Sequence, residues 1–303
     1  MRRSSALVRR PESAVRFGAG ARSSKDWLPG CSRTLATATQ RQNLVEEAYE
    51  VLLPPSSSAR SSLPYTMVLT CEHASMRLPS PYAWPQEDQR LVGTHWSYDP
   101  GSEDLTRELS AATGAAGVLS RFSRLLVDPN RPRDLSSPTL FRDIADSQPV
   151  LLNKGLSPEE KNSRLTRYYD PYHAALSQLV EQAQPRLLLS VHSFTPEYEG
   201  QKRSMEIGVL FTEDEELATC ANQHLNDLSY KSVLNEPWSG KAGFMNSADQ
   251  HCKAFNNTKA KKTCSALMLE IRQDLITRPE WRAKLCQDLS ELLGSARFSR
   301  IVA

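Results

Sequence analysis

Short apolar runs alternate with longer amphipathic stretches from residue 66 to the end of the chain. Five of the runs have the length of a strand and carry few polar side chains, which is typical of strands that are buried on both faces. These predicted strands span residues 66–70, 117–119, 186–191, 205–211 and 266–271. We therefore expect a sheet that is covered by helices.

Helical patterns lie between these runs. Residues 102–113 begin with Ser, Glu and Asp, and acidic groups stabilise the N-terminus of a helix. Ser157 and Glu160 have the spacing of a capping box, and periodic apolar positions then continue to about residue 183. Two further helices are expected at 213–228 and 279–293. This alternation of strands and helices predicts an α/β fold with a largely parallel or mixed sheet.

Charge sets the start of the chain apart from the rest. Residues 1–41 contain eight Arg and one Lys against two acidic residues, a net charge of +7, and the segment is rich in Ser and Ala. This composition is typical of an organellar transit peptide, so we expect a mitochondrial location, with plastid or cytoplasm as alternatives. A disordered basic tail without a targeting role, or an upstream extension of a gene model, would have the same composition.

The next segment, residues 42–64, is expected to be a linker. It contains a short amphipathic stretch at 44–53 and then a stretch rich in Pro and Ser, which packs poorly. We expect the remaining residues, 65–303, to form a single α/β domain. Hydrophobic residues make up 39% of the chain, which is enough to build its core.

The overall composition excludes two classes of protein. No apolar run approaches the roughly 18 residues that span a bilayer, so we expect no membrane insertion. The net charge of +2 argues against a nucleic-acid binder. The six cysteines form no C-x-x-C pair, which favours buried thiols in a reducing compartment. Cys71, at the end of an apolar run, is interpreted as one of these rather than as a nucleophile.

Three polar side chains stand at the ends of predicted strands. His73 follows the first strand, His192 follows the run at 186–191, and Glu270 lies near the end of the last strand. Open α/β sheets place their ligand crevice at the carboxyl ends of the strands. Two imidazoles and a carboxylate at that edge are the components of a catalytic zinc site with a general base. The alternatives are hydrogen-bonded structural histidines and a glutamate that is paired with Arg272.

A catalytic zinc ion needs a third protein ligand. Met76 occupies the place where an H-x-x-E motif would have its carboxylate, which leaves Asp99 and Glu72 as candidates. Asp99 precedes a Pro-Gly turn at the head of a helix, so it could cap that helix instead. His95 could support the site or bind the metal.

A second polar cluster runs from residue 120 to residue 131. It contains Arg121, Arg124, Asn130 and Arg131 around an apolar stretch. Arginine binds carboxylates through two parallel hydrogen bonds, so one interpretation is the capture of an acidic substrate. The alternative is a surface network of ion pairs with the aspartates of this segment.

Six strings in order along residues 45–295 resemble the N-formylglutamate amidohydrolase family. They are TCEHAS (70–75), YDPG (98–101), Asp128 with Asn130-Arg131, SVHSFTP (190–196), NEPWSG (235–240) and LEIRQDL (269–275). The resemblance implies a zinc-peptidase-like, three-layer α/β/α fold with a mixed, largely parallel sheet, and it makes residues 65–303 the catalytic domain. It also implies zinc-dependent hydrolysis of a small acidic acyl amino acid, N-formyl-L-glutamate, to formate and L-glutamate.

The resemblance also assigns roles to individual residues. His73 and His192 are similar to metal ligands of the family, Glu270 to the general base, and Arg124 to the arginine that polarises the scissile carbonyl. Asn130 and Arg131 resemble a pair that holds a substrate carboxylate. The remaining expected residues are Asp99 as third metal ligand and, for substrate binding, Arg121, Arg203 and His251.

Two rival functions share these features. The same chemistry could serve another N-acyl amino acid or a small peptide, because a fold does not settle a substrate. A binding protein with a decayed site would retain the fold without turnover.

Overall fold

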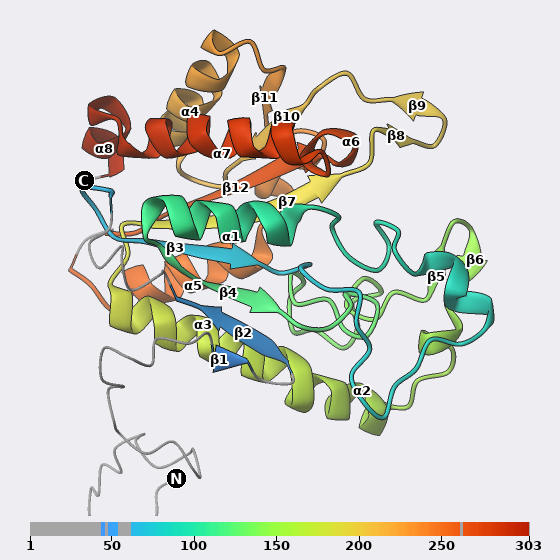
Figure 1. Cartoon of the computed structure of the whole chain (residues 1–303). Coiled ribbons are helices and arrows are strands. Elements are labelled where there is room, and N and C mark those ends of the chain that lie inside the picture. The colour runs from blue at the N-terminus through green and yellow to red at the C-terminus, as the bar shows by residue number, and fades with distance from the viewer. Residues whose placement is uncertain (1–43, 46–47, 54–61, 261–262, 303) are drawn as a thin grey trace, which may run out of the picture. The chain divides into compact units, whose positions relative to one another are not determined.

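An eight-stranded sheet forms the centre of the computed structural model, which describes residues 44–45, 48–53, 62–260 and 263–302 (Figure 1). Its strands, in spatial order, are β1 (Leu44–Val45), β2 (Tyr49–Leu52), β4 (Ala116–Ser120), β3 (Met67–Cys71), β7 (Leu187–Phe194), β12 (Ser265–Arg272), β10 (Ile207–Leu210) and β11 (Ser232–Leu234). The four central strands, β4, β3, β7 and β12, are parallel to one another. β2 is antiparallel to β4, and β10 is antiparallel to β12.

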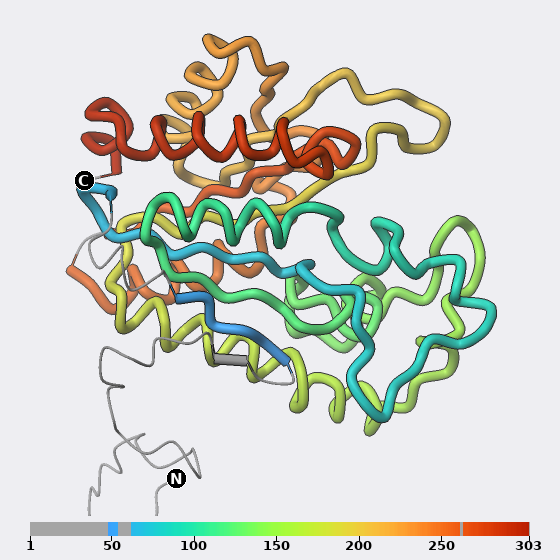
Figure 2. Tube along the Cα trace, in the orientation of Figure 1, coloured from blue at the N-terminus to red at the C-terminus, as the bar shows by residue number. Residues whose placement is uncertain are grey.

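Helices cover both faces of this sheet. One face carries α1 (Ser102–Thr113), α4 (Glu215–Asp227), α7 (Pro279–Gly294) and α8 (Ala296–Val302), and the other carries α3 (Asp170–Ala183) and α5 (Asn246–Asn256). α1 and α7 are far apart in sequence but pack side by side (Figure 2). The expected three-layer α/β/α fold with a mixed, largely parallel sheet is thus confirmed.

The side chains of the central strands alternate between two cores. On β3 and β7, Leu69 and Leu189 pack under α1 and α7, while their neighbours Val68 and Leu188 pack under α3. Each fully buried aliphatic side chain contributes about 1.5–3 kcal/mol to stability. Cys71 is also buried, as expected, and burial raises the pKa of its thiol, so it is a packing residue.

The helix expected from the capping box is present in two parts. The Ser157 hydroxyl accepts a hydrogen bond from the backbone N–H of Glu160 and caps α2 (Pro158–Arg164). A π-helical turn, Leu165–Tyr169, joins α2 to α3. The smaller elements are α6 (Gln273–Ile276) and the hairpins β5 (Ile144–Ala145) with β6 (Gln148–Pro149) and β8 (Glu197–Tyr198) with β9 (Gln201–Lys202).

The segment expected to be a linker, residues 42–64, contains two strands of the sheet instead. β2 pairs along its whole length with β4, and its Glu50 is buried. The guanidinium of Arg107 donates to both oxygens of Glu50, at 2.9 and 2.6 Å. This ion pair explains why the strand was missed, since an inward-facing carboxylate obscures its apolar pattern. The described fold therefore begins at residue 44 rather than at 65, whereas the basic segment 1–41 lies outside the described residues.

No helix in the described part of the chain combines the length and the apolar character that crossing a membrane requires.

Candidate metal centre

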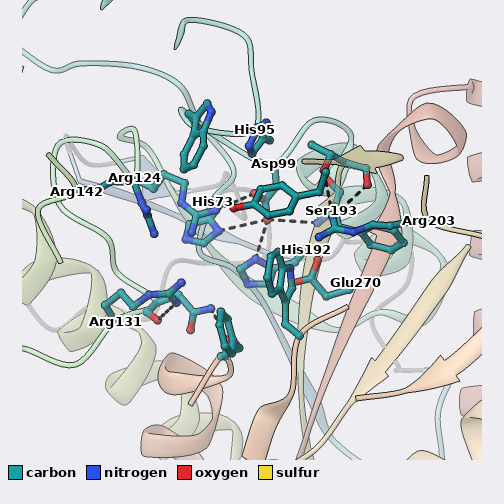
Figure 3. Close-up of a pocket in the computed structure, with 17 residues that line it drawn as sticks. His73, His95, Asp99, Arg124, Arg131, Arg142, His192, Ser193, Arg203 and Glu270 are labelled. Atoms are coloured by element: carbon teal, nitrogen blue, oxygen red, sulfur yellow. Dashed lines mark hydrogen bonds and ion pairs between the residues drawn. The ribbon is translucent and has the colours of Figure 1, made fainter. Parts of the chain in front are cut away.

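Three strands and one loop bring the predicted site residues together. His73 follows the end of β3 by two residues, and His192 on β7 lies directly beside Glu270 on β12 in the parallel register. The loop before α1 supplies Asp99, whose backbone N–H donates to the carbonyl oxygen of His73 at 2.9 Å. Figure 3 shows these side chains around one cavity, so the expected convergence at the carboxyl ends of the strands is confirmed.

His73, Asp99 and His192 form a compact set of metal-binding atoms. One oxygen of Asp99, Oδ2, lies 3.3 Å from Nδ1 of His73 and 2.8 Å from Nδ1 of His192. The ligand atoms of the three residues all lie within 4.8 Å of one another, and all three residues are buried. Two imidazoles and a carboxylate with room for further ligands are the donor set of a catalytic zinc site.

The far nitrogen of each imidazole is held by a second carboxylate. Nε2 of His73 lies 2.8 Å from Asp128, and Nε2 of His192 lies 2.9 Å from Glu72. Since a carboxylate accepts, each Nε2 carries a proton and Nδ1 is the nitrogen that faces Asp99. Metal-binding histidines have the same arrangement, in which a carboxylate fixes the tautomer and raises the basicity of the ligand nitrogen. The residues present therefore fit a divalent cation.

Hydrogen bonds and opposite charges, rather than burial, set the direction of the pKa shifts of Glu72 and His192. Burial raises the pKa of Glu72, but its hydrogen bond to His192 and the charge of that ring outweigh burial and hold the pKa far below its usual range. Burial lowers the pKa of His192, yet hydrogen bonds to Asp99 and Glu72 raise it to about 10. Binding of a cation at Nδ1 replaces a proton there, so metal affinity depends on pH.

The geometry also decides between the two candidates for the third ligand. Asp99 does not cap α1, because the N-cap residue is Gly101 and no side chain caps that end. Glu72 lies behind His192, where its Oε2 accepts from the ring and from the hydroxyl of Ser190 at 2.7 Å. Asp99 is therefore the carboxylate that faces both imidazoles.

Glu270 has the environment of a proton acceptor. Its side chain is buried and lines the cavity, and its Oε2 has no hydrogen-bond partner among the described residues. Burial raises its pKa to about 7. The alternative of a structural pair with Arg272 is wrong, because the Arg272 guanidinium is bound to Asp274 at 2.7 Å.

Arg124 lies at the edge of the metal-binding set and lines the same cavity. Its Nη2 donates to Asp128 at 3.0 Å, and its Nη1 donates to Asp99 at 3.3 Å. The two aspartates hold the guanidinium in place next to the three candidate ligands.

Three further guanidinium groups line the cavity without a carboxylate partner in the described part of the chain. Arg131 lies over the ring of Phe244, and Arg142 lies over Trp96. Arg203 lies between aromatic rings and donates to Thr195. Burial lowers the pKa of each arginine, as expected for cations that lack full compensation.

The cavity has a volume of about 230 Å³, below the range of roughly 300–1,000 Å³ that is typical of pockets for drug-sized ligands. It is therefore suited to a small ligand. The lining residues are His73, His95, Trp96, Asp99, Arg124, Asn130, Arg131, Arg142, His192, Ser193, Phe194, Thr195, Tyr198, Arg203, Trp238, Phe244 and Glu270.

Two residues that were expected to bind substrate lie elsewhere. Arg121 does not line the cavity, and its guanidinium donates to Glu103 at 2.8 Å. His251 is buried between α3 and α5, where its Nε2 lies 2.8 Å from Nδ1 of His173. Both expectations were wrong. They rested on closeness to the motifs in the sequence, which does not show that Arg121 pairs with Glu103 or that His251 contacts His173.

Asn130 lines the cavity, and both ends of its side-chain amide hold backbone groups. Its Nδ2 donates to the carbonyl oxygen of Phe244, and its Oδ1 accepts from the backbone N–H of Ser247. Its role in the structure is to hold the start of α5. His95 also lines the cavity and packs its ring on Trp96 at 4.6 Å, so it supports the wall and is not one of the three clustered ligands.

Sequence reasoning missed Arg142 and the aromatic wall. Arg142 lies in a loop with no apolar pattern beside it, and only tertiary packing brings it to the cavity. Phe194, at the end of β7, and Trp238, in a loop, both lie in the family-like strings and were a usable signal, because ligand pockets are lined largely by apolar and aromatic side chains.

Known proteins that resemble this chain identify its family. The model of the family described as N-formylglutamate amidohydrolase matches residues 65–277. An N-formylglutamate deformylase of Pseudomonas putida is 31% identical over 146 residues, which are 42% of this chain and 51% of that protein. The match thus spans about half the length of that relative.

Solved structures extend the comparison to nearly the whole described fold. A gene product of Agrobacterium tumefaciens is 28% identical with a TM-score of 0.71, and the match covers 82% of this chain and 94% of that chain. An N-formylglutamate amidohydrolase from Ralstonia eutropha, 22% identical, has the same fold with a TM-score of 0.60 over 85% of this chain and 98% of that chain. Since the family model covers more than two thirds of the sequence, the chain belongs to the N-formylglutamate amidohydrolase family.

Proposed function

We propose that this protein hydrolyses the amide bond of a small acidic N-acyl amino acid, with N-formyl-L-glutamate as the substrate and formate and L-glutamate as the products. The observation that carries the proposal is the position of Glu270. Its unsatisfied, buried carboxylate oxygen shares one cavity with His73, Asp99 and His192. A buried base beside a metal-binding set is the arrangement that hydrolysis of an amide by water requires.

Each residue of the centre has a defined task in this reaction. His73, Asp99 and His192 would hold the ion, for which zinc suits the donor set. When bound, such an ion lowers the pKa of water and polarises a carbonyl oxygen. Glu270 accepts the proton of the attacking water and passes it to the leaving nitrogen. Arg124 donates to the oxygen on which negative charge develops, in the manner of an oxyanion hole.

The unpaired arginines favour a substrate with more than one carboxylate. Arg131, Arg142 and Arg203 bring three positive charges to a partly buried cavity, and buried charges are normally paired. Figure 3 shows Arg131 and Arg142 on one side of the imidazole pair and Arg203 beside Glu270 on the other. An acyl glutamate has two carboxylates that can bind to separate guanidinium groups, and arginine binds carboxylates with defined geometry.

Formate release by the zinc-loaded full chain tests the proposal. N-formyl-L-glutamate should be hydrolysed, and N-formyl-L-glutamine, which lacks the second carboxylate, should be a much poorer substrate. A panel of N-acetyl and N-succinyl glutamates and aspartates then separates this activity from hydrolysis of another acyl amino acid. Binding of zinc without hydrolysis of any member of the panel would refute the proposed function.

A further inference from the structure

The turn formed by residues 128–131 supplies two parts of the site. Asp128 holds Nε2 of His73, and Arg131 presents its guanidinium to the cavity. Each of the four backbone carbonyl groups of this turn accepts a hydrogen bond. The Asp128 carbonyl accepts from the Arg131 N–H, and the Asn130 carbonyl accepts from the Arg131 side chain. The hydroxyl of Tyr169 donates to the Arg131 carbonyl at 2.8 Å.

The remaining carbonyl, that of Pro129, is held by a buried imidazole. Nε2 of His173, on α3, lies 3.0 Å from this oxygen. Because a carbonyl only accepts, Nε2 must carry the proton and Nδ1 of the same ring must be an acceptor. The nearest donor to that Nδ1 is Nε2 of His251 at 2.8 Å, and the amide of Gln250 lies 3.0 Å from the same atom and shares its one lone pair.

The chain of hydrogen bonds continues behind the second ring. When Nε2 of His251 donates to His173, its Nδ1 accepts from the hydroxyl of Ser177 at 3.2 Å. The tautomers of both rings are then fixed in one direction, from Ser177 through His251 and His173 to the Pro129 carbonyl. The two rings lie edge to edge and nearly coplanar, with planes at 17° and centroids 5.1 Å apart, as an in-line N–H···N bond requires. Burial lowers the pKa of His173 to about 4 and that of His251 to about 3, so both rings are neutral near pH 7.

We propose that His173 is a positioning residue for the metal centre and the cavity, and that it acts through the Pro129 carbonyl. The proline ring fixes φ at Pro129, so the hydrogen bond to its carbonyl fixes the next peptide plane as well. That plane lies between Asp128, which orients His73, and Arg131, which faces the substrate. Loss of a group that hydrogen-bonds to a metal ligand typically lowers metal affinity about 10- to 100-fold. The part of this inference that concerns substrate rests on the proposed function.

A matched pair of variants tests the inference. His173→Gln places an amide N–H near the position of Nε2 and should still reach Pro129, whereas His173→Asn places its amide near Nδ1 and should not. We expect His173→Asn to weaken zinc binding about 10-fold and to raise KM for N-formyl-L-glutamate. His173→Gln should stay within about threefold of the wild type in both quantities. Val180→Ala, a buried position on the same helix, is the control for a general loss of stability.

The measurements are zinc affinity, by competition with a chelator, and the separate values of kcat and KM. The inference is overturned when the Asn and Gln variants bind zinc equally well, or when Val180→Ala weakens zinc binding as much as His173→Asn does. If the wild type binds zinc but releases no formate, the proposed function fails, while the zinc affinities still decide the role of His173. A wild-type chain that binds no zinc would refute both.

Discussion

Glu270 on β12 has one carboxylate oxygen without a partner in the described chain, and burial raises its pKa to about 7. The Glu270→Gln substitution keeps the shape of the side chain but cannot accept the proton of water. We expect turnover to fall about 10²- to 10⁴-fold, the usual contribution of a general base. Zinc content should be unchanged, because Glu270 is not one of the three clustered ligands.

The pH dependence of kcat/KM provides a second measurement for Glu270. The carboxylate must be ionised to accept a proton, so activity should fall as the pH drops through the pKa of this group. A bound cation lowers that pKa, which places the acid limb at or below pH 7. A Glu270→Gln protein that lost its zinc, or that kept most of its turnover, would contradict the role as base.

Arg142 and Arg121 form a matched pair for substrate binding. Arg142 lines the cavity without a carboxylate partner among the described residues, whereas Arg121 is outside it and is paired with Glu103. A hydrogen bond to a charged group contributes about 1.5–3 kcal/mol, so Arg142→Met should raise KM for N-formyl-L-glutamate about 10- to 150-fold. The Arg121→Met control should leave KM within about twofold. Equal effects of the two substitutions would show that Arg142 does not bind the substrate.

Sequence information was sufficient for some of these side chains and not for others. His73, His192 and Glu270 could be predicted because strand ends in a parallel sheet share one edge, whatever the rest of the packing does. The bond of Asp128 to His73 and the place of Arg142 depend on loop conformation, for which the sequence has no periodic signal. The same limitation explains the wrong expectations for Arg121 and His251.

At the scale of elements, α3 and α5 are joined by the pair of His173 and His251. Burial lowers the pKa of both rings, to about 4 and about 3, while the unfolded chain binds protons near pH 6.5. Above pH 6.5 the pair is neutral in both states, and it adds no pH dependence. As the pH falls below 6.5, the unfolded state gains protons that the folded state does not bind, so stability decreases until the folded pKa values are reached.

We therefore expect the free energy of unfolding to depend less steeply on pH in a His251→Gln variant than in the wild type. The difference in slope should approach about 1.4 kcal/mol per pH unit between pH 6 and pH 4, which corresponds to one proton. Urea unfolding of both proteins across this range measures it. Parallel curves would mean that His251 is protonated in the folded protein at these pH values.

Elements with strong apolar periodicity were predicted well, and those with polar interruptions were not. β3, β7 and β12 each contain an unbroken run of at least three apolar residues, and their expected ranges differ from the observed ones by few residues. β2 was interpreted as part of a linker because its buried Glu50 depends on Arg107, which comes 57 residues later in the chain. α5 was missed as well, since its polar residues conceal a narrow apolar stripe.

At the scale of the whole molecule, the metal centre connects segments that are distant in sequence. His73, Asp99 and His192 come from the loop after β3, from the loop before α1 and from β7. Only the folded chain brings them together, so a cation that binds them stabilises the folded state. Zinc at 100 times its Kd stabilises such a protein by about 2.7 kcal/mol. Chelation should therefore lower the Tm by about 5–10 °C. An unchanged Tm would argue against a resident ion.

The central claim is that His73, Asp99 and His192 bind one divalent cation, and elemental analysis of the zinc-reconstituted full chain tests it most directly. The wild type and the Arg121→Met control should each contain one zinc per chain after removal of excess metal. A variant with both His73→Ala and His192→Ala should contain none, and it should keep its fold by circular dichroism. A wild-type chain without stoichiometric zinc, or a double variant that retains one equivalent, would contradict the account.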